Sequence, residues 1–141
     1  MKLNIRHIAA AAAVPVLMTL SSFTGAPRPK ADSKIMFKGG GDTVVVMTEK
    51  LTEDVFGYID IVPLRLSFVR TKLAKIDVLP NEETPRYMQQ VEEALLPRWE
   101  GKEIEQILQT KVDGVSGATY TAEAVIEGVI RGTKYRKTHD L

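Results

Sequence analysis

Hydroxyl side chains and very small residues are concentrated between Asp113 and Thr121, where the sequence reads Asp-Gly-Val-Ser-Gly-Ala-Thr-Tyr-Thr. Such a segment can carry a phosphate ester, because Thr119 supplies a hydroxyl and Gly117 lets the backbone approach a bulky group closely. The apolar pattern that follows predicts a helix beginning just after Thr119, and its free N–H groups and positive dipole end would stabilise a phosphate. The same residues also fit a polar turn in which Thr119 or Thr121 caps the helix. The two interpretations are compatible.

Reduced to Asp-x-x-Ser-Gly-Ala-Thr-x-Thr, this segment resembles the flavinylation signature of the FMN-binding domain family. That family includes the C subunit of the sodium-translocating NADH:quinone reductase and the G subunit of the Rnf electron-transfer complex. The resemblance implies that the phosphate of FMN is esterified to Thr119, which makes FMN a covalent cofactor. It also implies that Asp113 belongs to the signal read by a magnesium-dependent flavin transferase of the ApbE type.

The resemblance extends over about residues 56–133. Gly57-Tyr58 followed by Pro63-Leu64 is similar to the family's opening Gly-Tyr strand and Pro-hydrophobic step. Glu83-Thr84-Pro85 is similar to its Glu-Thr-Pro-Gly loop, which in relatives lies against the flavin ring. Arg86 stands where glycine is usual, and it either lies near the ring or its phosphate or is a solvated side chain in a first helical turn. The candidate cofactor-binding residues are therefore Glu83, Thr84, Pro85, Asp113, Ser116, Gly117, Ala118, Thr119, Tyr120 and Thr121.

Strand patterns occupy the first half of the chain. The β-branched run at 43–47 and the apolar segment 56–62 predict two strands. Leu64, Leu66 and Phe68 alternate with more polar residues, as in a half-buried strand, and Ala74, Ile76 and Val78 do the same. A hairpin that turns near residues 71–72 should join these two strands.

Helix patterns follow in the second half. Thr84-Pro85 predicts a helix start, since threonine caps well and proline is favoured at the first position, and Pro97 should end that helix. A short helix is expected around residues 104–108, and a long one after Thr119 with apolar residues at i, i+3, i+4, i+7 and i+8. Strands before helices predict an α+β fold, a small antiparallel sheet with helices packed on one face. Tyr87 and Trp99 fit either core or rim positions or a place beside a flavin.

The N-terminus resembles an export signal. Lys2 and Arg6 precede an apolar stretch over residues 8–20, which is shorter than an ordinary membrane-spanning helix. We therefore expect residues 1–31 to be a signal peptide or a short anchor, 32–42 a linker, and 43–141 the FMN-binding domain. This organisation predicts an extracytoplasmic, periplasmic protein that is membrane-associated if the signal is retained.

Composition excludes several other classes. The absence of cysteine rules out disulfides and cysteine metal sites, and the isolated His7 and His139 predict no metal site. Four of the 19 basic residues and none of the 18 acidic ones lie in 1–31, so the remainder carries a net charge near −3 and predicts no nucleic-acid partner.

We therefore expect an exported electron carrier with one covalent FMN. Its partners would be a flavin transferase and membrane-associated redox proteins, and no catalytic residues are assigned because no substrate site can be assembled from the sequence. Two alternatives remain open: a sensor module that holds FMN non-covalently, and a reductase component that passes electrons to a small extracytoplasmic substrate.

Overall fold

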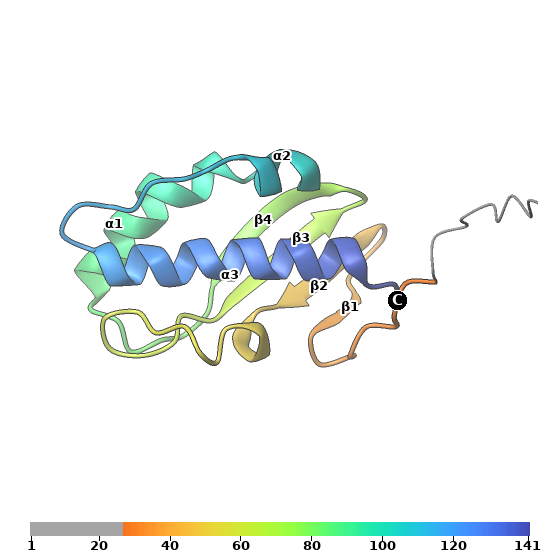
Figure 1. Cartoon of the computed structure of the whole chain (residues 1–141), viewed down its shortest axis with the longest axis horizontal. Helices are drawn as coiled ribbons and strands as arrows, with labels where there is room; N and C mark the ends of the chain where they lie inside the picture. Colours follow the sequence, from red (N-terminus) through yellow and green to blue (C-terminus); the bar gives the residue numbers. More distant parts are fainter. Residues whose placement is uncertain (1–26) are drawn as a thin grey trace, which may run out of the picture.

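The computed structural model describes residues 27–141, which form one four-stranded antiparallel sheet and three α-helices (Figure 1). The sheet order is β1-β2-β3-β4, the order of the strands in the chain. The elements are β1 Met36–Lys38, β2 Thr43–Met47, η1 Glu49–Leu51, β3 Leu64–Val69, β4 Lys72–Val78, α1 Pro85–Leu95, η2 Leu96–Arg98, α2 Ile104–Gln109 and α3 Thr119–Thr138. This arrangement confirms the α+β prediction. Within these residues no helix is long and apolar enough to span a bilayer.

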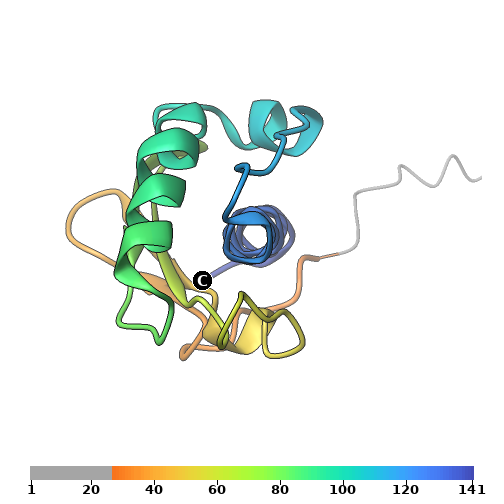
Figure 2. The same cartoon turned by 90° about the vertical axis from the view of Figure 1, so that its left-hand side faces the viewer.

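One face of the sheet is covered and the other is open to solvent. In β3 the alternating side chains Leu64, Leu66 and Phe68 are fully buried, whereas Arg65 and Val69 are exposed. Helix α3 packs across the buried face of β2 and β3. Figure 2 views α3 end-on and shows α1, α2 and the segment between β2 and β3 arranged around it. The predicted apolar stripe of α3 is therefore its packing surface.

Two glycines bring α3 close to the sheet. A Cβ at Gly128 would lie 2.9 Å from Leu64 Cδ1, and one at Gly132 would overlap Leu66 Cδ1 and lie 3.1 Å from Thr48 Cγ2. Since a side chain at either position would push the helix outward, Gly128-x-x-x-Gly132 sets the distance between α3 and β3. The first residue of the same helix is Thr119.

Three expectations need correction. Segment 32–42, predicted as a linker, contains β1, whose Met36 is fully buried and pairs with Val46; three residues are too few to show a strand period. Segment 56–62 is not a strand but a loop, because the N–H groups of residues 58–60 bond to the Glu83 side chain and not to a neighbouring strand. In β4 a bulge opposite Ser67 and Phe68 shifts the register, so Leu73 is buried and the predicted core residue Ala74 is exposed.

The predicted hairpin and helix starts are confirmed. The chain turns between β3 and β4 at residues 70–71, and α1 begins at Pro85. At the other end of the domain, Ala31 N donates to Asp140 O at 2.8 Å, so the first described residues lie beside the C-terminus. Helix α3, 20 residues or about 30 Å long, separates this end from Thr119 (Figure 1).

Candidate functional site

Thr119 is the first residue of α3, and its side chain is exposed. The preceding Gly117 has φ +84°, a conformation that favours glycine and turns the chain sharply into the helix. The N-cap residue is Ala118, and within residues 27–141 no side chain caps this helix. The first N–H groups of α3 therefore remain available beside the Thr119 hydroxyl, which is the arrangement that stabilises a phosphate at a helix start.

A hollow of about 540 Å³ lies next to Thr119. Its walls come from three separate segments: Tyr58 from the loop before β3, Thr84 and Tyr87 from the start of α1, and residues 117–121 from the turn into α3. Tyr58 and Tyr120 are 68% and 61% exposed, so two aromatic rings stand out at the surface, and Tyr87 supplies a third ring to the lining. We call this feature the tyrosine hollow. Aromatic faces of this kind suit a flat conjugated ring.

Glu83 lies behind the tyrosine hollow and holds its parts together. The residue is only 5% exposed. Its Oε1 accepts the N–H groups of Ile59 at 2.7 Å and Asp60 at 3.1 Å, and its Oε2 accepts the N–H of Tyr58 at 3.0 Å. The same Oε2 accepts a short hydrogen bond from the buried Thr121 hydroxyl. One carboxylate thus ties the Tyr58 loop to the first turn of α3.

These contacts determine the protonation of Glu83. Burial by itself would raise the pKa of this carboxyl, but the hydrogen bonds from Thr121 and from the N–H groups of Ile59, Asp60 and Tyr58 outweigh it and hold the pKa below its usual value. Glu83 is therefore ionised at neutral pH, which is the state that accepts all four hydrogen bonds.

Gly57 makes room for this carboxylate. A Cβ at Gly57 would lie 2.7 Å from Glu83 Oε1 and 2.8 Å from Glu83 Cδ. Any larger residue would push the carboxylate away from its four donors. The Gly-Tyr pair at 57–58 therefore has a physical reason here: glycine admits Glu83, and Tyr58 forms a wall of the tyrosine hollow.

The other predicted site residues lie around this centre. Thr84, Gly117, Ala118, Tyr120 and Thr121 line the tyrosine hollow with Thr119, whereas Glu83 and Pro85 line a neighbouring one. Asp113 lines a separate, acidic depression together with Thr119, Glu123 and Glu127. Ser116 is exposed in the turn. No group of three or more metal-binding side chains is found within residues 27–141.

Trp99, Tyr87 and Arg86 occupy three different environments. Trp99 is 1% exposed and belongs to the core. Tyr87 is 38% exposed and lies at the tyrosine hollow. Arg86 is exposed and is not among the residues that line the hollow.

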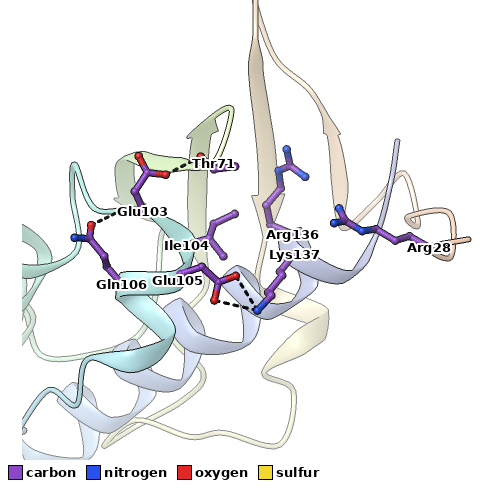
Figure 3. Close-up of a pocket in the computed structure, with 8 residues that line it drawn as sticks. All are labelled: Arg28, Thr71, Glu103, Ile104, Glu105, Gln106, Arg136 and Lys137. Carbon is purple, nitrogen blue, oxygen red and sulfur yellow. Dashed lines mark hydrogen bonds and ion pairs between the residues drawn. The ribbon is translucent and has the colours of Figure 1, made fainter. Parts of the chain in front are cut away.

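A second cavity, about 590 Å³ in volume, lies near the opposite end of α3 (Figure 3). Among its lining residues Lys137 Nζ lies 2.8 Å from Glu105 Oε1, and Thr71 Oγ1 donates to Glu103 at 2.6 Å. Its two arginines have partners outside the lining: Arg28 lies 3.5 Å from Asp140, and Arg136 donates to Arg70 O at 3.3 Å. Glu103 N donates to Gln106 at 3.0 Å, closing a capping box at the start of α2. The tyrosine hollow is the better candidate site, because it contains Thr119 and exposed aromatic rings.

Comparison with known proteins assigns the family. The family model described as FMN-binding domain matches residues 57–134, more than half of the chain. The chain belongs to the FMN-binding domain family. No curated protein matches it, and no solved structure does.

The FMN-binding domain match begins at Gly57 and ends at Lys134 within α3, so it contains every residue that lines the tyrosine hollow. From the sequence, Glu83 was a predicted cofactor-binding residue and Tyr58 was not; in the structure Tyr58 lines the tyrosine hollow and Glu83 bonds to its backbone. The signal for Tyr58 was its position next to Gly57, but the reason for that pairing is a contact with a residue more than 20 positions away.

Proposed function

We propose that this FMN-binding domain is an exported electron-transfer flavoprotein in which FMN is attached through a phosphodiester to Thr119. The observation that carries the proposal is the position of the Thr119 hydroxyl. It is exposed on the first residue of α3, beside uncapped N–H groups and on the rim of the tyrosine hollow. One residue thus combines the chemistry for an ester, a favourable environment for its phosphate and a neighbouring surface for an aromatic ring.

The residues present fit FMN. The hollow of about 540 Å³ is within the range of roughly 300–1,000 Å³ that is usual for small-molecule sites. Thr119 would carry the phosphate, the first N–H groups of α3 would bind its oxygens, and Tyr58, Tyr87 and Tyr120 would contact the ring. When bound, FMN supplies one- and two-electron transfer. No lysine or arginine of residues 27–141 lines the hollow, so the phosphate charge would be balanced by the helix start.

Covalent attachment and export support each other. A reversibly bound flavin is lost by mass action where free flavin is scarce, and an ester bond removes that loss. The first described residues lie at the end of α3 opposite Thr119. An N-terminal signal or anchor would therefore leave the tyrosine hollow free for redox partners. We accordingly assign the protein to the periplasm, with a flavin transferase of the ApbE type and membrane-associated redox proteins as partners.

Two other functions predict different behaviour. A sensor module with non-covalent FMN would release the flavin when it unfolds in denaturant, whereas the phosphodiester would keep it attached. A reductase component would be reoxidised by a small substrate in the absence of any partner protein. Both share the tyrosine hollow with our proposal, so only these measurements separate them.

The test begins with protein exported from a strain that contains a flavin transferase. Dithionite should bleach its yellow absorbance, and a quinone should restore it, as expected for a carrier. Flavin that remains with the chain after denaturation and desalting supports the phosphodiester. Release of all flavin at that step contradicts covalent attachment, and a bound flavin inert to dithionite contradicts electron carriage.

A further inference from the structure

The hydrogen bonds of Glu83 join the two segments that would enclose the flavin ring. The Tyr58 loop and the first turn of α3 are more than 50 residues apart in sequence, and Glu83 bonds to both. We propose that Glu83 is a positioning residue for the flavin: by holding the Tyr58 loop to Thr121, it fixes the Tyr58 side chain against the ring carried on Thr119. This inference rests on the proposed function and concerns the same site.

The Tyr58 side chain is held through its backbone and not through its hydroxyl. Its side chain is 68% exposed, and no hydrogen bond to its hydroxyl is found in the described part of the chain. Its position therefore follows from its backbone, and the N–H groups of residues 58, 59 and 60 all donate to Glu83. The loop adds two internal bonds, from Gly57 N to Asp60 O at 2.8 Å and from Ile61 N to Asp60 Oδ1 at 2.7 Å.

Thr121 completes the connection on the α3 side. Its side chain is 1% exposed and points inward to Glu83, whereas Thr119, two residues earlier, is exposed. The carboxylate is thus bonded two residues from the attachment point and directly to the amide of Tyr58. Because the pKa of Glu83 is held low by these same bonds, the carboxylate accepts all of them at neutral pH. Hydrogen bonds from supporting residues hold the residues of a binding site in position, and the site becomes less well defined when those bonds are removed.

The decisive comparison is Thr121→Val against Thr121→Ser. Valine matches threonine in shape but removes the hydroxyl bond to Glu83. Serine retains a hydroxyl and should restore that bond and the position of the Tyr58 loop. Gly57→Ala perturbs the same carboxylate from outside the attachment motif, since the added Cβ would lie 2.7 Å from Glu83 Oε1. Tyr58→Leu serves as the reference for a hollow that lacks its Tyr58 ring.

The full-length proteins are coproduced with a flavin transferase, and every signal is divided by the FMN that stays covalently bound. The readouts are flavin fluorescence lifetime and anisotropy, because a tyrosine in contact with the ring quenches its emission and restrains it. Unfolding curves for each variant confirm that the chain is folded. A purely structural role for Glu83 would change the unfolding midpoint without changing these flavin signals in the folded protein.

We expect a longer lifetime and a loss of anisotropy in Thr121→Val and Gly57→Ala, approaching Tyr58→Leu, with Thr121→Ser close to wild type. Folded Thr121→Val and Gly57→Ala with wild-type lifetime and anisotropy overturn the positioning role but leave the proposed function intact. Wild-type protein without covalent FMN refutes the proposed function, and the positioning role with it.

Discussion

Replacing Glu83 with glutamine should destabilise the folded domain even without flavin. In the more favourable orientation of the glutamine side chain, its amide oxygen still accepts hydrogen bonds from the N–H groups of Ile59 and Asp60. The Thr121 hydroxyl turns to accept a hydrogen bond from the new NH₂ group. That NH₂ group then faces the N–H of Tyr58, donor against donor. In the opposite orientation two backbone donors are left unpaired, which is worse.

The magnitude follows from this count. A buried donor left unpaired costs about 1–3 kcal/mol, and bonds to a charged acceptor are stronger by about 1 kcal/mol than those to a neutral one. We therefore expect Glu83→Gln to lower the free energy of unfolding by about 2–4 kcal/mol. With urea m-values of about 1–3 kcal/mol/M, the midpoint should fall by about 1–4 M.

Urea unfolding of flavin-free protein at pH 7 measures this loss, with Glu82→Gln as the matched control because Glu82 is an exposed neighbour. The low pKa of Glu83 also fixes the pH dependence. The ionised Glu83 contributes its full stabilisation at pH values above the usual glutamate pKa. This stabilisation is lost as the pH falls through the lower pKa that Glu83 has in the folded state. The difference in free energy of unfolding between wild type and Glu83→Gln should therefore become smaller in acid. A Glu83→Gln midpoint equal to that of Glu82→Gln at pH 7 would refute the reasoning.

Three other predictions concern separate parts of the molecule. Gly132→Ala should destabilise the domain, because overpacking against Leu66 costs about 1–3 kcal/mol and exceeds the gain of about 1 kcal/mol in helix propensity. The control is Gly40→Ala, whose added Cβ would have nothing within 4 Å. A stabilised Gly132→Ala in urea unfolding would contradict the close packing of α3. A reporter active only outside the cytoplasm should give signal when fused to residues 1–31, and activity confined to the cytoplasm would remove the export proposal. Arg86→Gly should leave the flavin reduction potential unchanged, since Arg86 does not line the tyrosine hollow, and a fall in potential would place it near the ring.

The elements that the sequence predicted well are those whose signals are local. The alternation in β3, the Thr84-Pro85 start of α1 and the apolar stripe of α3 depend on residues a few positions apart, and all three are present. The failures depend on partners distant in sequence. Segment 56–62 is apolar enough for a strand, yet the N–H groups of residues 58–60 bond to Glu83, more than 20 positions away in sequence.

The site shows the same division. Asp113 and residues 116–121 were predicted as one cluster because they are close in sequence; residues 117–121 line the tyrosine hollow, whereas Asp113 and Ser116 do not. The contribution of Tyr58 could not be derived from its own neighbourhood, because it depends on the space that Gly57 leaves for Glu83. The residue type at 83 was recognised as part of the site, but its role behind the hollow required the tertiary contacts.

The measurement that tests the central claim most directly is the intact mass of the exported protein, coproduced with a flavin transferase, for wild type and Thr119→Ala. Wild type should gain the mass of one FMN less one water, with the modified peptide mapping to Thr119. Thr119→Ala should show no added mass and still unfold cooperatively, since the Thr119 side chain is exposed and makes no capping bond within the described residues. Full flavinylation of Thr119→Ala, or a modified peptide that maps to Ser116 or Thr121, would contradict the assignment.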